Sequence, residues 1–448
     1  MSAPVDAYAR LVRQGPGAAL ARRLGAPRPT ALRRWEAGAD LLTGPALVLG
    51  IGAAPLAADV SRWLAAAGAR LADAEAATDD RFGAVVLDAS AVRTTADLAA
   101  VREPLAPAFR RLAANGRVLV LGALVADTTT VEAAAVQQAL EGLVRTLGKE
   151  ARAGATVNLL RVGEGAGEAL RGPLEFLASA RSAFVSGQVL EVGPARGGDA
   201  ARASAGPRTA VVTGAAQGIG AAVAEVLARS GTHVVCVDLA AQGEQLARVA
   251  NRVGGSALHL DITAASAPAA LAEHLLRRHG GADVVVHNAG ITRDRSFVNL
   301  DEAGWASVLE VNLRAPLRLT EGLLAREGAL RPQARVVQLS SINGIAGAKG
   351  QANYAASKAG VIGMVRALDA RLAASGGAAS AVAPGFVETA MTARMPLLPR
   401  EVGRRASSLQ QGGLPVDVAE AVAFLAGPAA AGISGQVLRV CGQNLLGA

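Results

Sequence analysis

The chain of 448 residues repeats its own plan. The segment SGQVLEV at 186–192 returns as SGQVLRV at 434–440, and EGLVRTLGKEARAGATVNLLRV at 141–162 resembles IGMVRALDARLAASGGAASAVA at 362–383. An internal duplication explains these matches better than chance. Because the length alone suggests two or three domains, we expect two domains that share one fold.

The second half alternates apolar strands with helical patterns. Residues 209–231 read as a strand, a glycine turn and a helix, and the runs 282–290 and 334–341 read as strands that end in small or polar residues. This alternation is typical of βαβ units in a parallel sheet, where ligands bind at the carboxyl ends of the strands. The first half carries a blurred version of the pattern. We therefore predict an α/β fold with two doubly wound, Rossmann-like parallel-sheet domains, the N-terminal one degenerate and flavodoxin-like.

Composition and the repeat set the domain boundaries. Residues 1–40 match neither copy and are predicted to form a helical extension. Residues 41–195 should form the degenerate domain, and the stretch 196–207, rich in Gly, Ala and Arg, should be the linker. The catalytic domain is then 208–448.

The composition is that of a globular α/β protein, because 51% of the residues are hydrophobic and 18% are charged. The two cysteines, Cys236 and Cys441, each lie in a valine-rich run, so we predict buried thiols in a reducing compartment. The five histidines are scattered, and we predict no metal site.

The formal net charge of +8 does not indicate nucleic-acid binding, because the basic residues are spread along the chain without a long block. It suits anionic substrates such as coenzyme A esters or an acidic carrier protein. The start MSAPVDAYAR lacks the features of a secretory signal, and no apolar run is long enough to cross a bilayer. We expect a cytoplasmic protein with no membrane association.

The first strand of the second half is followed by a glycine-rich turn. Thr213, Gly214, Gly218 and Gly220 form the pattern TGxxxGxG. Glycines here let the backbone approach a pyrophosphate, which the amides and the positive dipole at the start of the helix can hold. The pattern differs from the GxGxxG fingerprint, and glycine turns without a ligand are common. The turn indicates a nucleotide site only together with other motifs.

Asp238 ends the next strand, where an acidic side chain can accept hydrogen bonds from a ribose 2′-hydroxyl. Its carboxylate would repel a 2′-phosphate, and residues 215–217 include no basic side chain to receive one. The cofactor is therefore predicted to be NADH rather than NADPH. The alternative is that Asp238 merely caps a loop.

Tyr354 and Lys358 have the spacing YxxxK in the run GQANYAASKAG. Residues four apart are neighbours on a helix surface, so both side chains lie on one face. Taken alone, such a pair is more often a solvated helix surface than a catalytic pair.

Several separated motifs together resemble the short-chain dehydrogenase/reductase family. In the order and spacing of that family, the sequence has TGAAQGIG at 213–220, Asp261–Ile262, NAG at 288–290, Asn312, Ser341, Tyr354 with Lys358, and Pro384–Gly385. Within the family, SSINGIAGAKGQANYAASKAGVIGMVRAL and APGFVETAMT look closest to 3-oxoacyl-acyl-carrier-protein reductases. The degenerate first copy and the ending LRVCGQNLLGA resemble the high-molecular-weight branch of these reductases.

The resemblance implies a catalytic tetrad of Asn312, Ser341, Tyr354 and Lys358. It also implies a nicotinamide cofactor, held by Gly214, Gln217, Gly218, Ile219, Gly220, Asp238, Asp261, Ile262, Asn288, Ala289, Gly290, Tyr354, Lys358, Pro384, Gly385, Val387 and Thr389.

These residue types suit the reduction of a ketone, which needs a hydride on carbon and a proton on the developing alkoxide. Tyr354 can donate that proton, and we expect Lys358 and the positive nicotinamide ring to lower its pKa from an ordinary value of about 10. Ser341 can hold the substrate carbonyl. By family analogy, Asn312 would anchor a water that relays protons to Lys358.

The first copy has lost these residues. Gly52 is followed by AAPL rather than by further glycines, Gly122 and Ala123 replace the two serines at the end of the corresponding strand, and Gln137 stands opposite Lys358. We predict that the first copy is not a second active site.

We therefore predict NADH-dependent reduction of 3-oxoacyl thioesters in fatty acid metabolism, with acyl carrier protein or coenzyme A as the acyl carrier. One alternative is a short-chain dehydrogenase that acts on another ketone or alcohol. A second alternative is a noncatalytic NAD-binding or nucleic-acid-binding scaffold, against which the intact Tyr354 and Lys358 argue.

Two expectations concern the surroundings of the site. Residues 391–415 are predicted to form a mobile lid, in which arginines such as Arg404 and Arg405 meet phosphates of the acyl carrier; the alternative is a solvated loop. The first copy keeps strand and helix patterns, so we expect it to take the place of a subunit and the protein to be a homodimer. The resemblance implies that the tail at 441–448 reaches the neighbouring subunit.

Overall fold

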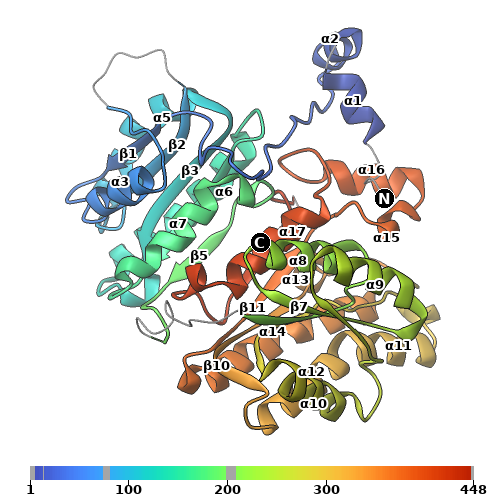
Figure 1. Cartoon of the computed structure of the whole chain (residues 1–448). Coiled ribbons are helices and arrows are strands. Elements are labelled where there is room, and N and C mark those ends of the chain that lie inside the picture. Colours follow the sequence, from blue (N-terminus) through green and yellow to red (C-terminus); the bar gives the residue numbers. More distant parts are fainter. Residues whose placement is uncertain (1–5, 14, 74–80, 198–207, 445–448) are drawn as a thin grey trace. The chain divides into compact units, whose positions relative to one another are not determined.

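The computed structural model describes residues 6–13, 15–73, 81–197 and 208–444 (Figure 1). The chain forms two compact units. The first unit covers the chain up to Ala195, together with residues 393–413 and the stretch that begins at Val440. The second unit covers Arg196–Thr392 and Leu414–Arg439.

The first unit is built on a five-stranded sheet in the order β1-β2-β3-β4-β5. Each strand pairs in parallel with its neighbour, and the strands are β1 (Ala46–Gly50), β2 (Phe82–Asp88), β3 (Leu112–Ala123), β4 (Thr156–Val162) and β5 (Val189–Val192). Leu71 adds one parallel bridge to Ala46 on the other edge of β1. Counted with that bridge, the strand order is the flavodoxin-like one, with its second strand reduced to a single bridge.

The helices of the first unit are α1 (Ala7–Arg13), α2 (Gly15–Arg23), α3 (Ala57–Ala66), α4 (Thr95–Ala100), α5 (Arg102–Arg110), α6 (Val131–Glu150), α7 (Arg171–Ala178) and α16 (Leu397–Arg405). The longest, α6, begins after Thr130, whose side chain accepts a hydrogen bond from the Ala133 amide. Its apolar stripe, which includes Val136, Leu140 and Val144, is buried in the core of this unit.

The second unit is built on a seven-stranded sheet in the order β12-β11-β10-β9-β6-β7-β8. The strands are β6 (Thr209–Thr213), β7 (His233–Asp238), β8 (Ser256–His259), β9 (Ala282–His287), β10 (Leu330–Leu339), β11 (Ala378–Pro384) and β12 (Val437–Val440). The order reverses between β6 and β9, and in open α/β sheets ligands bind at such a switch point.

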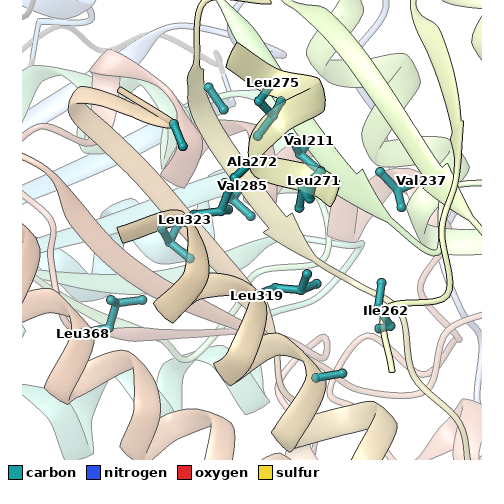
Figure 2. Close-up of a cluster of buried hydrophobic side chains, with 14 of the residues drawn as sticks. Val211, Val237, Ile262, Leu271, Ala272, Leu275, Val285, Leu319, Leu323 and Leu368 are labelled. Carbon is teal, nitrogen blue, oxygen red and sulfur yellow. The ribbon is translucent and has the colours of Figure 1, made fainter. Parts of the chain in front are cut away.

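The helices of the second unit are α8 (Gly218–Arg229), α9 (Gly243–Arg252), α10 (Ala267–His279), α11 (Glu302–Leu309), α12 (Ala315–Ala325), α13 (Ile342–Ala346), α14 (Ala352–Leu372) and α17 (Pro415–Ala426), and α15 (Ala390–Ala393) lies at the boundary of the two units. Figure 2 shows part of the core, where leucines of α10 and α12 such as Leu271 and Leu319 lie with strand valines such as Val211 and Val285. Burying one such leucine stabilises the fold by roughly 2 kcal/mol. None of the described helices is long and apolar enough to span a bilayer.

The prediction of two parallel-sheet α/β domains is confirmed. Cys236 and Cys441 are buried free thiols, as the sequence predicted. Residues 393–413 and 440–444, which lie within the predicted catalytic domain 208–448, group with the first unit. Most of the predicted linker and the tail at 445–448 lie outside the described residues.

Gln443 groups with the first unit and fills a notch there. In the second unit, Asp369 on α14 accepts hydrogen bonds from both terminal nitrogens of Arg196 at 2.9 Å. The first copy has Gly148 at the corresponding position, and a Cβ on Gly148 would lie only 2.3 Å from Oε1 of Gln443. Nε2 of Gln443 donates to the Arg145 carbonyl. The chain end thus supplies a polar side chain where the first copy has none.

Burial of His287 makes the stability of the second unit depend on pH. Its Nε2 lies 2.9 Å from Oγ1 of Thr320, and burial lowers its pKa to about 4 from an ordinary 6.5. Between these values the unfolded chain binds a proton that the folded chain does not, so stability falls as pH decreases, by on the order of 2 kcal/mol at pH 5. Urea midpoints at pH 7.5 and pH 5 should show this loss, and His287→Gln should reduce it.

The matched control is His259→Gln, because His259 is exposed at the end of β8. This variant should keep the pH dependence of the parent protein. An unchanged pH dependence in His287→Gln would contradict the assignment to His287.

Candidate active site

The carboxyl end of β6 leads into the glycine turn at the switch point. Gly214 and Gly218 have φ angles of +67° and +61°, which side-chain-bearing residues rarely adopt. A Cβ on Gly220 would lie 2.1 Å from the Gly214 carbonyl oxygen, whereas a Cβ on Gly218 would meet open space. Gln217 precedes α8 and makes no side-chain capping hydrogen bond. The first amides of α8, from Gly218 through Ile219, are therefore placed to bind an anion such as the pyrophosphate of a dinucleotide.

Asn288, just beyond β9, fixes this turn. Its Nδ2 donates to the carbonyl oxygens of Thr213 and Gly214 at 3.0 and 3.1 Å. The backbone amides of Asn288 and Ala289 both donate to Oγ1 of Thr213, at 3.1 and 3.2 Å. Because the Asn288 side chain uses carbonyl oxygens of the turn, it leaves the amides at the start of α8 to a ligand.

Asp238 caps a loop, which is the alternative that the sequence left open, and it keeps room for the predicted role as well. Its Oδ2 accepts from the Ala216 amide at 3.0 Å and its Oδ1 from the Leu239 amide at 2.9 Å, so it does cap a loop. A carboxylate has further lone pairs, and these can accept from a ribose hydroxyl. Farther along the same edge, hydrogen bonds from Thr263 lower the pKa of Asp261.

Tyr354 and Lys358 lie on α14, one turn apart. Gly344 allows α13 to approach α14 closely, since a Cβ there would lie 2.7 Å from the Lys358 carbonyl carbon. Nζ of Lys358 is buried, donates to the Leu339 carbonyl at 2.7 Å and lies 5.8 Å from the centre of the Tyr354 ring. The solvated-surface alternative is therefore wrong for Lys358.

Ser341 follows β10 and is the N-cap of α13. Its Oγ accepts from the Asn343 amide at 3.2 Å, which leaves the hydroxyl hydrogen free to donate. The Ser341 hydroxyl is also within hydrogen-bonding reach of the Tyr354 side chain. Serine, tyrosine and the end of β10 thus meet at one point.

Asn312 lies in a π-helical turn, η7 (Glu310–Arg314), of the kind often found at functional sites. Its Oδ1 accepts from the Ile291 amide at 2.8 Å, and its Nδ2 donates to the Ile291 carbonyl at 3.0 Å and to Oγ of Ser357 at 3.1 Å. A Cβ on Gly290 would lie 3.3 Å from Oδ1 of Asn312 and 3.5 Å from Nζ of Lys358. Glycine at 290 therefore lets the asparagine and the lysine meet beside β9.

Burial dominates the electrostatics of this group. It raises the pKa of Tyr354, which the Ser341 hydrogen bond lowers and the charge of Asp294 raises. It also lowers the pKa of Lys358 to about 8. The prediction that Lys358 lowers the pKa of Tyr354 is wrong for the protein alone, because Nζ is directed at the Leu339 carbonyl. A phenol that stays protonated at neutral pH is the form that can donate a proton.

The loop after β11 forms a compact turn. Val387 is buried, and its carbonyl accepts from Oγ1 of Thr392 at 2.8 Å, while the Thr389 amide donates to the same Oγ1 at 2.9 Å. Pro384 and Gly385 lie at the carboxyl end of β11. Most of the predicted site residues thus lie at or just beyond strand ends of the second unit. Helical segments supply the others, which are Gly218, Ile219 and Gly220 at the start of α8, Asn312 in η7, and Tyr354 and Lys358 on α14.

A hydrogen-bond chain beside Ser341 involves residues that the sequence did not suggest. Nδ2 of Asn343 donates to Oε1 of Gln351 at 2.7 Å, and Nε2 of Gln351 donates to the exposed carboxylate of Asp294 at 2.8 Å. This hydrogen-bond chain fixes the side chain of Asn343, whose backbone amide donates to Ser341. It also brings the negative charge of Asp294 near Tyr354. Only the nearness of Gln351 to Tyr354 in the sequence could have indicated it.

The first unit is closed at the corresponding place. Asp88 stands where the second copy has Asn288, is fully buried, and accepts from the Leu56 amide before α3 at 2.7 Å. The Asp88 carboxylate thus accepts a hydrogen bond from an amide at the start of α3, and its negative charge would repel a phosphate there. Gln137, which replaces the lysine, accepts from the Ala123 amide at 2.8 Å. In the first copy, the polar side chains at these two positions therefore accept hydrogen bonds from backbone amides of the same unit.

The predicted lid, residues 391–415, is partly helical, and residues 393–399 are exposed. It contains α16, and the side chains of Arg404 and Arg405 both pair with Glu401. Arg405 also pairs with Asp6 at 2.6 Å. Because these guanidinium groups already have carboxylate partners, the structure does not favour the expectation that they meet phosphates of an acyl carrier.

Known proteins resemble the second unit. Residues 214–442 match the family model described as enoyl-(acyl carrier protein) reductase. The chain is 37% identical over 235 residues to the 3-oxoacyl-[acyl-carrier-protein] reductase of Vibrio cholerae, and 38% identical over 237 residues to nodulation protein G of Rhizobium sp.. Each match covers 52% of this chain and 96% of the relative. The solved structure of a short-chain dehydrogenase/reductase, glucose/ribitol dehydrogenase, from Brucella melitensis matches with 32% identity and a TM-score of 0.49, covering 52% of this chain and 95% of that chain.

The matched region begins at the glycine turn and contains all four residues of the proposed tetrad. The chain belongs to the short-chain dehydrogenase/reductase family, as the sequence motifs predicted. It is therefore an oxidoreductase of a family that uses a nicotinamide cofactor, and the glycine turn, Asn288 and the open start of α8 fit such a group.

Replacing Asn288 by aspartate should convert the second unit to the arrangement of the first. The carboxylate cannot donate to the Thr213 and Gly214 carbonyls, and it adds a negative charge at the start of α8, so Asn288→Asp should weaken NADH binding by about tenfold or more. A fluorescence titration with NADH measures the Kd directly.

The matched control is Asn251→Asp, which makes the same charge change at an exposed position of α9 and should leave the Kd unchanged. Equal affinity in Asn288→Asp and the parent protein would show that Asn288 does not control the cofactor site.

Proposed function

We propose that this protein reduces 3-oxoacyl thioesters to 3-hydroxyacyl thioesters with NADH. The proposal is carried by the arrangement of Ser341, Tyr354, Lys358 and Asn312 beside the carboxyl ends of β9 and β10 in the second unit. The names of relatives such as the Vibrio cholerae reductase support this substrate class. A bound reduced nicotinamide would supply the hydride to the ketone carbon, C3 of the acyl chain, and the protein would supply the proton to the ketone oxygen.

The four side chains divide this work. Tyr354 donates the proton, because its phenol is protonated at neutral pH and burial raises its pKa above the ordinary value. Ser341, oriented by the Asn343 amide, holds the substrate oxygen. Lys358 is mostly charged at neutral pH, since its pKa is about 8, and it places this positive charge beside the Tyr354 ring. Asn312 keeps the loop at Ile291 in place beside the lysine.

NADH suits the site better than NADPH. Asp238 lies at the end of β7, where a 2′-phosphate would be repelled by its carboxylate. Residues 215–217, which contact this carboxylate through the Ala216 amide, include no basic side chain to offset the repulsion.

We propose that the acyl carrier is coenzyme A or acyl carrier protein. We also propose that two chains form a homodimer, for which light scattering should give twice the chain mass.

Steady-state kinetics with matched thioesters tests the proposed reaction. Acetoacetyl and longer 3-oxoacyl coenzyme A esters should be reduced, each with a higher kcat/KM for NADH than for NADPH. The 2-enoyl esters of the same chain lengths should be poor substrates. Preferred reduction of the enoyl esters would contradict the proposal and favour the reaction in the description of the family model, and a preference for NADPH would contradict the role given to Asp238.

Tyr354→Phe tests the proton donor. Removing the phenolic hydroxyl should lower kcat for 3-oxoacyl reduction by about 10²- to 10⁴-fold, because general acid catalysis typically contributes that much. The Kd for NADH should change little, since binding of the pyrophosphate depends on the glycine turn. Near-normal turnover in this variant would rule out Tyr354 as the donor.

A further inference from the structure

Asp6, in the N-terminal part of the first unit, forms an ion pair with Arg405 of α16. Both carboxylate oxygens of Asp6 accept from Arg405, at 2.6 Å from Nη1 and 2.8 Å from Nη2. The two side chains are only 18% and 15% exposed. Burial alone would raise the pKa of Asp6, but hydrogen bonds from Arg405 and the Ala9 amide, with the charges of Arg405 and Arg404, bring it below its ordinary value. This is a two-pronged, largely desolvated ion pair, the strong kind.

Further contacts fix the same guanidinium. The ring of Tyr8 lies 4.7 Å from it, and the hydroxyl of Tyr8 donates to the Pro27 carbonyl at 2.7 Å. Nη1 of Arg405 also donates to the Gln410 carbonyl at 3.0 Å. Arg405 is thus held on its charged edge by Asp6 and on its face by an aromatic ring, a geometry that suits arginine better than lysine.

A second row of hydrogen bonds continues the attachment. Oε1 of Gln410 accepts from the Arg28 amide at 3.0 Å, and Nε2 of Gln411 donates to the Thr30 carbonyl at 2.7 Å. Gln410 has a φ of +57°, a conformation that a residue with a side chain keeps only when its surroundings hold it. We call the contacts of residues 6–30 with residues 401–411 the N-terminal clasp.

The clasp joins a part of the chain outside the family match to a part inside it. Residues 6–30 precede the family match, which begins at Gly214, whereas residues 401–411 lie inside it. The segment 393–413 starts directly after the turn at Thr389 and Thr392, which follows the predicted site residues Pro384 and Gly385. Along α16 it exposes the apolar side chains of Leu397, Leu398 and Val402.

We propose that Asp6 and Tyr8 are positioning residues for the reductase: by holding Arg405 they fix the segment 393–413 and so set the affinity for the acyl substrate. This inference rests on the proposed function for its substrate and on the clasp geometry for its structural part. The residues of the clasp act through Arg405 and do not touch the reacting atoms.

Hydrogen–deuterium exchange and kinetics on the full-length protein test the proposal. Asp6→Asn removes the charge and one acceptor, so amides within 397–411 should exchange about tenfold faster. KM for acetoacetyl coenzyme A should rise several-fold while kcat stays within about twofold, the pattern expected when substrate binding alone is weakened. Asp6→Glu, which keeps the carboxylate, should restore most of the protection and the KM.

The matched control is Asp59→Asn on α3, which breaks an exposed ion pair with Arg62 in the same unit and should change neither readout. Unchanged exchange of 397–411 in Asp6→Asn would overturn the proposal, as would faster exchange with an unchanged KM. Failure to reduce any 3-oxoacyl thioester would contradict the proposed function alone. The exchange measurement needs no substrate, so it would still decide whether the clasp holds the segment 393–413.

Discussion

The polarity of one side chain at a strand end separates the two copies of this fold. Asn288 donates hydrogen bonds to carbonyl oxygens of the glycine turn and leaves the amides at the start of α8 to an anion. Asp88, at the corresponding position, accepts from the Leu56 amide and places a buried negative charge at the start of α3. A helix start can hold one anion at a time. The second copy is therefore suited to a dinucleotide, and the first copy binds its own carboxylate.

Burial gives the reacting side chains their proton chemistry. Close packing of α13 on α14, which requires glycine at 344, brings Lys358 into the interior beneath the end of β10. The same burial raises the pKa of Tyr354 and lowers that of Lys358 to about 8. At neutral pH the phenol of Tyr354 is therefore protonated, and Lys358 still carries most of its positive charge. A solvated pair with the same YxxxK spacing would keep the ordinary pKa values, about 10 for each group.

Motifs local in the sequence were predictable, and contacts between distant segments were not. The glycine turn, Asp238 and the YxxxK pair each combine residue type with a strand or helix start, so the fold and the site residues of the second unit could be placed from the sequence. Gln443 filling the notch beside Gly148 and Arg405 pairing with Asp6 join residues hundreds of positions apart with no repeating pattern. The pKa of Tyr354 was also misjudged, because burial depends on packing and not on spacing.

The number of NADH molecules bound per chain tests most directly whether the two copies differ as their strand ends indicate. Isothermal titration of the full-length protein with NADH reports this stoichiometry without relying on any substrate. We expect one NADH per chain, bound at the glycine turn of the second unit. Two per chain would contradict the conclusion that Asp88 closes the first copy, and none would contradict the assignment of a cofactor site to the second.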